Sequence, residues 1–426
     1  MDDTPLPTQT CPAAPESDMS AATSAAGTPA AAGALTGVRV VDISRVLAGP
    51  YAAQLLGDHG ADVIKVEPPA GDGTRAWGET YGENVSAYYA GLNRNKRHTS
   101  VDLATPGGRE LLLRMLDRAD VLIENFKPGT MERWGLDTED LLARFPRLIY
   151  CRISAFGAEG PMGGLPGYDA VLQAYAGIMH LNGEQGRGPL RVPMPITDLT
   201  TGLHAFSGIL LALYERAASG RGQVVEISLL DSAISLLHPA AAAYFLDGKR
   251  PQRMGAGHPS ISPSNIFRTA GGHDIYVSAG TDHQFRLLCD FLDAPELAED
   301  TRFRSNHDRL EHDGELTELL AKLIADLATD DEMVRRMIAQ GIPASVVRPL
   351  DEVLDDPQVQ LNGMVQAVGD FRVLGIPVKL GRTPGSLRTP PAPQGRDTRE
   401  VLIDMGLTDT QIDELIAQGI VAPPLP

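Results

Sequence analysis

One aspartate, Asp198, is the residue of this sequence with the clearest chemical potential. It lies in the segment Pro195–Gly202, directly before a run, residues 199–218, with the apolar spacing of a long helix. An aspartate at that place most often caps the helix, and capping is the commoner of its two possible roles. The helix dipole and the free N–H groups also stabilise the carboxylate anion. We therefore expect Asp198 to be ionised at neutral pH and available as an oxygen nucleophile.

A glycine-rich segment, Gly255–Pro259, could serve the same chemistry. The glycines Gly255 and Gly257 would let the backbone approach a ligand closely and direct N–H groups at a developing oxyanion. Taken alone, the segment fits a flexible linker turn better. The loop histidine His258 has no visible partner, and the other histidines lack ligand spacing, so we predict no metal site.

A basic set is the third candidate, because it departs from an acidic composition. The chain has 37 basic and 55 acidic residues and a formal net charge of −18, which argues against nucleic acid as a partner. A local cluster of cations could still hold the phosphates of an anionic ligand. A solvated loop with local ion pairs explains it equally well. The set comprises Arg75, Arg94, Lys96, Arg97 and Arg133.

Alternating strands and helices are expected to position these residues. A strand over 38–43, a helix over 50–59 and a strand over 63–66 predict a β-α-β unit with a right-handed crossover. The pattern recurs with Thr105 as the cap of a helix ending at Leu116, followed by strands over 121–124 and 148–153. This order predicts an α/β fold with an open, largely parallel sheet. Neither a GxGxxG nor a GxxxxGK[ST] motif is present, so we predict no dinucleotide site of the Rossmann type.

The length of 426 residues suggests two to three domains. After the long helix, we expect a strand over 224–227, a helix over 231–237 and a final helix over 409–418. The predicted domains are a disordered tail (1–34), the first part of a large domain (35–246), a linker with the glycine loop (247–264), a small domain (265–345) and a return segment that completes the large domain (346–426).

The composition also bears on location. Three scattered cysteines form no disulfide framework or metal pattern, which fits a reducing compartment and a cytoplasmic location. The first 34 residues lack a basic region followed by an apolar one, so they do not resemble a secretory signal. The longest apolar runs are too short and interrupted to span a membrane, so we expect no membrane partner.

Read in order, these segments resemble the family III CoA-transferases (CaiB/BaiF type), which share a superfamily with α-methylacyl-CoA racemases and formyl-CoA transferases. The resemblance covers Leu35 to Val421 and depends on many ordered matches rather than on any single one. The matching segments are residues 35–42, 45–50, 60–67, 95–97, 124–129, 167–169, the Asp198 segment, 220–223, 341–344 and 401–407.

The resemblance implies a fold and an assembly. Family members have a large Rossmann-like domain with a parallel sheet and a smaller α+β domain joined by long linkers. Two subunits form an interlocked homodimer, threaded through each other like links of a chain. The C-terminal segment would return to the large domain.

The resemblance also implies a reaction. It identifies Asp198 as the nucleophile of an acyl-CoA:carboxylate CoA-transferase, which moves CoA between carboxylic acids through an aspartyl-CoA intermediate. The coenzyme A thioester would be a substrate, and no cofactor would be bound permanently. The glycine loop, with Gly255 and Gly257, would cover the intermediate. CoA contacts are implied at Val46, Leu47, Ala48, Asn125, Phe126, Arg133 and the segment 166–169, which includes Asp169, with Lys96 and Arg97 as phosphate contacts nearby. The implied catalytic residues are Asp198, Gly255, Gly257 and Tyr168.

Three departures from relatives narrow the expectation. Formyl-CoA transferases carry glutamine at the position of Leu47, which disfavours formyl-CoA and oxalate as substrates, and arginine at the position of Pro68. Racemases carry histidine at the position of Tyr168, whereas a phenol, with an ordinary pKa near ~10, is a poor base. A 2-methylacyl-CoA racemase therefore remains the alternative to the transferase.

Overall fold

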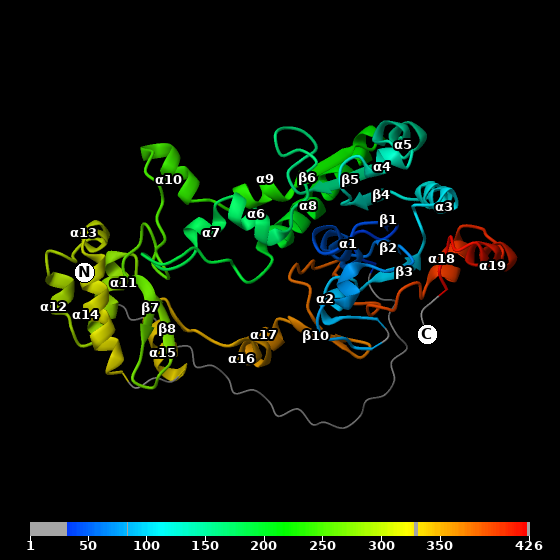
Figure 1. Ribbon diagram of the computed structural model, residues 1–426. Helices are drawn as coiled ribbons and strands as arrows, with labels where there is room; N and C mark the ends of the chain where they lie inside the picture. Colours follow the sequence, from blue (N-terminus) through cyan, green and yellow to red (C-terminus); the bar gives the residue numbers. More distant parts are fainter. Residues whose placement is uncertain (1–31, 83, 328–330, 424–426) are drawn as a thin grey trace, which may run out of the picture.

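The computed structural model describes residues 32–82, 84–327 and 331–423, so nearly all of the predicted tail lies outside the described residues. Figure 1 shows two lobes of unequal size, joined by two connections that run apart from each other. The larger lobe is built on a parallel sheet and the smaller one on an antiparallel sheet with helices. The predicted fold class is therefore confirmed.

The large sheet has six parallel strands in the order β3-β2-β1-β4-β5-β6. The chain order reverses between β1 and β4, and such a switch point is where open α/β sheets bind ligands, at the carboxyl ends of the strands. The strands are β1 (Arg39–Asp42), β2 (Asp62–Glu67), β3 (Lys96–Ser100), β4 (Val121–Glu124), β5 (Ile149–Ser154) and β6 (Val224–Ser228).

Both faces of this sheet are covered, and alternate residues of each strand face opposite sides. Val40 packs among residues of α1 (Ala48–Asp58) and α8 (Ile196–Ser219). Its neighbour Val41 packs on the other side among residues of α3 (Pro106–Leu116), α5 (Thr138–Arg144), α18 (Thr398–Asp404) and α19 (Asp409–Ala417). Burial on both faces explains the apolar runs of β1 and β4, whereas the buried strand β3 is polar.

The helix α8 carries Asp198 and crosses α1 closely at Gly202. A Cβ atom at Gly202 would lie 2.9 Å from the carbonyl oxygen of Ala48 and 2.9 Å from Cδ1 of Tyr51, so only glycine allows this approach. By length and composition α8 could span a membrane, as could the bent pair α9 (Leu229–Ser235) and α10 (Ala240–Asp247) taken together, whereas the sequence predicted no segment of sufficient length. Its packing against α1, β5 and β6 makes α8 a helix of the large lobe.

The small lobe contains β7 (Ser264–Arg268), β8 (Asp274–Ser278) and β9 (Ala344–Val346), all antiparallel. One apolar core joins this sheet to α11 (Asp282–Phe291), α14 (Asp313–Ala325) and α15 (Asp331–Ala339). Two shorter helices, α12 (Glu296–Glu299) and α13 (Asn306–Glu311), complete the lobe. The chain enters through residues 248–263 and leaves through α16 (Leu350–Asp355) and α17 (Pro357–Leu361).

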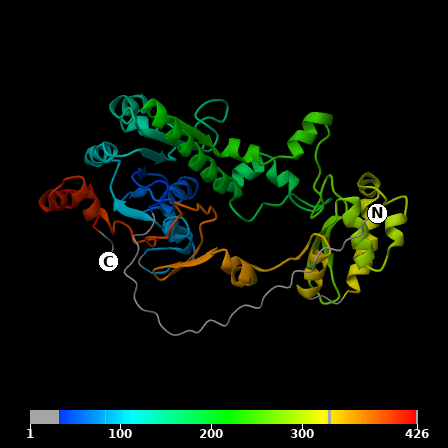
Figure 2. The same ribbon diagram turned by 180° about the vertical axis from the view of Figure 1, so that it is seen from behind.

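After the small lobe, the chain returns to the large one. It first forms a hairpin of β10 (Val365–Val368) and β11 (Phe371–Leu374). The terminal helices α18 and α19 then lie beside the β3 edge of the sheet (Figure 2). The N–H group of Asp102 donates to the carbonyl of Ile420 at 2.8 Å, and the N–H group of His98 donates to Asp397 at 2.7 Å. The large lobe is therefore built from both ends of the chain.

Candidate active site

A cleft of about 290 Å³ opens at the carboxyl edge of the sheet, beside the switch point between β1 and β4. The segments that follow β1, β4 and β5 form its walls, together with the first turns of α8 and α9. Its described lining is Arg45, Val46, Leu47, Ala48, Asn125, Phe126, Lys127, Pro128, Ile153, Ser154, Ala155, Leu165, Pro166, Gly167, Tyr168, Asp198 and Leu229. Eight of the predicted CoA contacts line this cleft together with the predicted nucleophile Asp198: Val46, Leu47, Ala48, Asn125, Phe126, Pro166, Gly167 and Tyr168.

The loop after β1 is held in an unusual backbone conformation. Val46 has a φ of 67°, which is costly for a β-branched residue and is typically found where the surrounding structure enforces it. Its N–H group donates to Asp72 at 3.1 Å. The side chain of Asn125 accepts from the N–H of Arg45 and donates to its carbonyl, both at 2.7 Å. The Asn125 amide therefore ties the β1 and β4 loops together.

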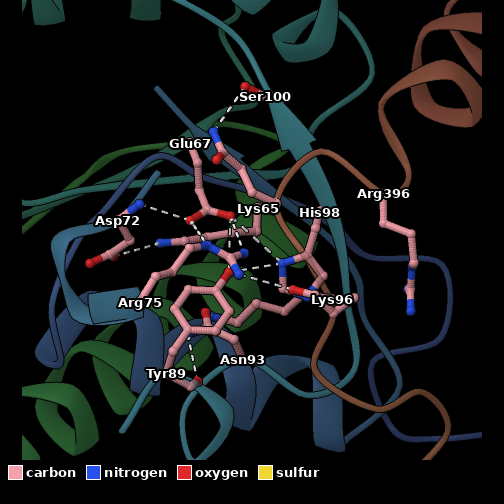
Figure 3. A network of polar contacts seen from close by, with 12 residues as sticks. Lys65, Glu67, Asp72, Arg75, Tyr89, Asn93, Lys96, His98, Ser100 and Arg396 are labelled. Atoms are coloured by element: carbon pink, nitrogen blue, oxygen red, sulfur yellow. Dashed lines mark hydrogen bonds and ion pairs between the residues drawn. The ribbon is translucent and has the colours of Figure 1, made fainter. Parts of the chain in front are cut away.

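A buried polar network that includes Lys65, Asp72 and Lys96 (Figure 3) contacts this loop through Asp72 and Lys65. Nζ of Lys96 donates to Asp42 at 3.0 Å, to the carbonyl of Pro50 at 2.8 Å and to Asn93 at 2.8 Å. Lys65 donates to the carbonyl of Ser44. Lys96 is 1% exposed and does not line the cleft. Lys96 thus contacts the start of α1 and lies outside the cleft that eight of the predicted CoA contacts line.

The other predicted cations are also engaged away from the cleft. Arg75 forms a buried pair with Glu67 at 2.7 Å, which lowers the pKa of that carboxyl, and Arg94 pairs with Asp58 at 2.6 Å. Arg97 pairs with Asp62 at 2.7 Å and Asp404 at 2.6 Å. Arg133 donates to Thr130 at 2.9 Å. The structure thus favours the ion-pair interpretation of the basic set, with most of the pairs buried rather than solvated.

Asp198 lies in the first turn of α8 and is not its cap, because the helix begins at Ile196. The cap comes from Asp169, whose Oδ1 accepts from the N–H of Thr197 at 2.9 Å and of Asp198 at 3.4 Å. Among the described residues, no group donates to the Asp198 carboxylate. Burial and the nearby charge of Asp169 raise the pKa of Asp198 to about 7. Asp198 is thus expected to be partly ionised at neutral pH and largely ionised above it, because burial and the Asp169 charge disfavour its anion.

The first residue of α6 (Asp169–Tyr175), Asp169, is thus a positioning residue rather than a wall of the cleft. Gln173 on the same helix donates to its Oδ2 at 2.7 Å and also accepts from the N–H of Val192 at 2.9 Å. These contacts fix the Asp169 carboxylate beneath the first turn of α8. Its neighbour Tyr168 lines the cleft and is 67% exposed.

The glycine loop is not part of this cleft. Gly255 and Gly257 lie on the first connection between the lobes, where their N–H groups donate to the carbonyls of Gly183 and Met254, both at 2.9 Å. Neither glycine is among the described residues that line the cleft. A single chain therefore does not bring the predicted loop and nucleophile together.

Two cations that the sequence reading did not single out do line the cleft, Arg45 and Lys127. The Arg45 guanidinium lies 5.1 Å from the centre of the Phe126 ring. A smaller adjoining pocket of about 190 Å³ shares Arg45 and Phe126 and adds Pro68, Leu103 and Trp134. Both cations belong to matched segments, 45–50 and 124–129, so their place directly after predicted strands was the signal that could have identified them.

The fold is a doubly wound α/β fold, and the site is a cleft at the carboxyl edge of the large sheet. Asp198 is the carboxylate in the described lining of that cleft. The sequence model of CoA-transferase family III matches residues 35–398. The chain belongs to this family, and it is an enzyme of the CoA-transferase class, which acts on CoA thioesters.

Individual relatives agree over most of the chain. The succinyl-CoA:glutarate CoA-transferase of Mus musculus is 36% identical over 394 residues, covering 91% of this chain and 90% of the relative. The succinate–glutarate CoA-transferase of Agrobacterium fabrum is 38% identical over 388 residues, covering 87% and 95%. A solved CaiB/BaiF family protein from Brucella suis aligns with a TM-score of 0.80 at 36% identity, covering 88% of this chain and 100% of the other.

Proposed function

We propose that this enzyme moves CoA between two carboxylic acids through a covalent intermediate on Asp198. The observation that carries the proposal is a carboxylate without a hydrogen-bond donor, facing a cleft at the switch point of the sheet. A carboxylate that is poorly solvated, and deprotonated above a pKa of about 7, is a reactive oxygen nucleophile. The named activities of the relatives support the transfer of CoA between acids.

The steps balance without an external reagent. A carboxylate oxygen of Asp198 attacks the thioester carbonyl of the donor, the C–S bond breaks, and CoA leaves as a thiolate. The thiolate attacks the aspartyl carbonyl of the mixed anhydride, releasing the donor acid as its carboxylate and forming aspartyl-CoA. The acceptor carboxylate then attacks this thioester, and the expelled thiolate attacks the new acyl carbonyl. Asp198 is regenerated, and one thioester has replaced another.

The charges at the cleft suggest how CoA is held. Arg45 and Lys127 are the cations in its lining and are placed to meet phosphate groups. The adjoining pocket has apolar and aromatic walls, including Pro68, Phe126 and Trp134, which suit a flat base. CoA would then extend from this pocket along Val46–Ala48 to place its thioester at Asp198.

We propose that two chains assemble to complete the site. The glycine loop lies outside the cleft of its own chain, and two separate connections join the lobes (Figure 1). An interlocked homodimer would use both features. Size-exclusion chromatography with light scattering tests this assembly, and a monomer under conditions of full activity would contradict it.

We also propose a cytoplasmic location, which the buried free thiols of Cys151 and Cys289 support. Fractionation of the native host tests it, and recovery of the enzyme in a membrane or exported fraction would contradict it.

The racemase alternative has less support in the cleft. Racemisation needs two groups that exchange a proton with the α-carbon. Among the described lining residues no histidine is present, and Asp198 is the one carboxylate. The transferase needs that single carboxylate and no second base.

Trapping tests the proposed intermediate. We would mix the enzyme separately with succinyl-CoA and acetyl-CoA, quench with hydroxylamine or borohydride, and map the modified peptide by mass spectrometry. Modification of Asp198 is expected, with its loss and at least a 1000-fold fall in turnover in Asp198→Asn. The control is Asp231→Asn, which changes the third residue of α9, just as Asp198 is the third residue of α8. Exchange of the α-proton with deuterium oxide, without an acceptor acid, would instead favour the racemase.

A further inference from the structure

A second cavity, larger than the cleft, adjoins it on the other side of Leu47. Its volume is about 540 Å³, and Leu47 lines both spaces. It lies between α1, the short helix α2 (Ala87–Ala90), the first turn of α8 and the hairpin β10–β11. Leu199, the residue after Asp198, is part of its wall. The cavity thus begins beside the nucleophile and extends away from the proposed CoA path.

The lining of this cavity is mostly apolar, with a few neutral or basic polar groups. Apolar side chains such as Leu47, Leu55, Leu199 and Met364 dominate, and none of the described lining residues is acidic. In a chain with a net charge of −18, a cavity of this size without a carboxylate in its described lining is unusual. The polar groups in the lining are Tyr51, Gln54, Tyr81, Tyr88, Arg94 and Arg372.

Gln54 is the most informative of these groups. It is 3% exposed, and its Oε1 atom has no hydrogen-bond partner among the described residues. A buried amide normally has partners, because leaving it unpaired costs free energy. Since an amide can turn by 180°, it can offer NH₂ to a carboxylate or oxygen to a carboxylic acid. The cavity therefore presents an unused hydrogen-bonding group to a ligand.

Three lining residues in and next to α1 show how the cavity extends away from Asp198. Leu47 directly precedes the helix, Tyr51 is four residues later and Gln54 three further on, so all three lie on one side. At a rise of 1.5 Å per residue, the path from Leu47 to Gln54 is about 10 Å. Tyr88 stands at the near end, where the charge of Asp198 and burial raise its pKa to about 12 and keep its phenol protonated. A ligand with its reacting end at Asp198 would thus place its far end near Gln54.

The two arginines differ in what they can offer. Arg94 donates to Asp58 through two nitrogens and to the carbonyl of Leu374 through the third, so its charge is already balanced. Arg372 on β11 is exposed, and its closest carboxylate, Asp355, is 3.7 Å away on an equally exposed side chain. Arg372 can therefore turn toward an anion that enters the cavity.

We propose that this cavity holds the chain of the carboxylic acid substrate, and that Gln54 and Arg372 bind a second carboxyl group at its far end. The inference rests on the proposed function and deepens it, because it makes the substrate class a dicarboxylic acid. The apolar walls accommodate the intervening methylene groups. The absence of acidic residues in the described lining lets a second negative charge enter.

The test compares acids of equal length that differ in the far carboxyl group. The pairs are succinate and butanoate, glutarate and pentanoate, and adipate and hexanoate. In a ping-pong scheme, kcat/KM for the acceptor does not depend on the donor, so one donor serves all pairs. The wild-type enzyme should prefer the dicarboxylate in at least one pair. Gln54→Leu keeps the size and should reduce that preference at least tenfold, mainly by lowering kcat/KM for the dicarboxylate.

Arg372→Gln should reduce the same preference by about three- to fivefold. Its matched control is Arg268→Gln, another exposed arginine on an antiparallel hairpin, paired with Asp274 in the small lobe. That control should leave the preference unchanged. A wild-type preference for monocarboxylates in every pair, or a Gln54→Leu preference within twofold of wild type, would overturn the proposal.

A binding measurement tests the proposed acid site independently of the proposed transferase activity. Asp198→Asn protein with saturating CoA should gain thermal stability from the preferred dicarboxylate and less from its monocarboxylate partner. The double variant Asp198→Asn/Gln54→Leu should lose that difference while remaining folded by circular dichroism. If no acid is ever converted but the binding difference is present, the proposed function fails and the acid site stands. If conversion occurs but neither arm depends on Gln54, the acid site fails alone.

Discussion

Asp169 caps the helix that presents Asp198: its Oδ1 atom accepts from the N–H of Thr197 at 2.9 Å and from the N–H of Asp198 itself at 3.4 Å. One carboxylate satisfies the positive end of α8, and the other is left facing the cleft without a donor. The nearby negative charge also raises the pKa of Asp198. Asp169 therefore caps the helix, and Asp198 is left free to react. A single helix-capping aspartate would have to do both.

Activity should rise with pH through about 7. Asp198 attacks only as a carboxylate, and burial together with Asp169 raises its pKa to about 7. We expect kcat/KM for the donor to increase about tenfold per pH unit below that value and to level off above it. An acyl-pantetheine donor, which has no phosphate, separates this titration from that of CoA. A profile that is flat from pH 5 to 9 would contradict the assignment.

Asp169→Asn should move that midpoint to lower pH. The amide keeps an acceptor for the N–H of Thr197 but removes the charge that raises the pKa of Asp198. The measurement is the pH profile of kcat/KM, with Asp137→Asn as the control, because Asp137 precedes α5 without a side-chain cap. If Asp169 bound CoA directly, KM for the donor would instead rise at an unchanged midpoint.

Asp198→Asn should stabilise the fold at high pH. The pKa of Asp198 is raised from 3.8 to about 7, so the native state loses stability as pH rises from about 4 to about 7. The amide lacks this titration. We expect the variant to gain on the order of 1 kcal/mol over wild type between pH 4 and pH 8, after allowance for partial exposure. Urea unfolding at both pH values measures it, and an equal gain in Asp231→Asn would sink the explanation.

Lys127→Ala should weaken binding of the donor, whereas Arg97→Ala should not. Lys127 lines the cleft, and a charge-assisted hydrogen bond contributes roughly 1.5–3 kcal/mol, so KM for acyl-CoA should rise about tenfold or more. Arg97 is held by Asp62 and Asp404 instead. Its loss should change KM less than about twofold while lowering stability. The reverse order of effects on KM would restore the original prediction for Arg97.

Gly202→Ala should impair both stability and turnover. The added methyl would lie 2.9 Å from the Ala48 carbonyl, so α1 and α8 must separate, at a cost of roughly 1–3 kcal/mol. Asp198 lies one turn away and would shift relative to Leu47. Thermal unfolding and kcat measure the two effects. Gly314→Ala in α14 is the control, because no atom lies within 4 Å of the new methyl, and it should lose nothing.

Elements with strong local signals could be predicted closely. The helix 106–116 and the strand 121–124 occur with the predicted limits, because Thr105 and Pro106 fix the helix start and a buried apolar run fixes the strand. The hairpin β10–β11 was missed although Gly369-Asp370 between two short runs is a local hairpin signal, and its packing on Tyr81 could not be read from the sequence.

The candidate site was predictable where its residues directly follow strands. Val46–Ala48 and Asn125–Phe126 lie at the carboxyl ends of β1 and β4, and topology brings them together. The role of Asp169 could not be read, because the cap lies 29 residues before the helix residue that it serves. Lys96 and Arg97 mislead for a simpler reason. Adjacent strand residues point their side chains to opposite faces of the sheet, and neither Lys96 nor Arg97 lines the cleft.

The contact between Asp102 and Ile420 has a consequence for biosynthesis. A ribosome that has completed all six strands, at residue 228, carries a nascent chain whose large lobe still lacks α18 and α19. The core of the small lobe, by contrast, lies entirely within residues 267–342. We therefore expect the small lobe to fold first during translation. The large lobe, although its sheet is synthesised earlier, can be completed only when α18 and α19 have been synthesised.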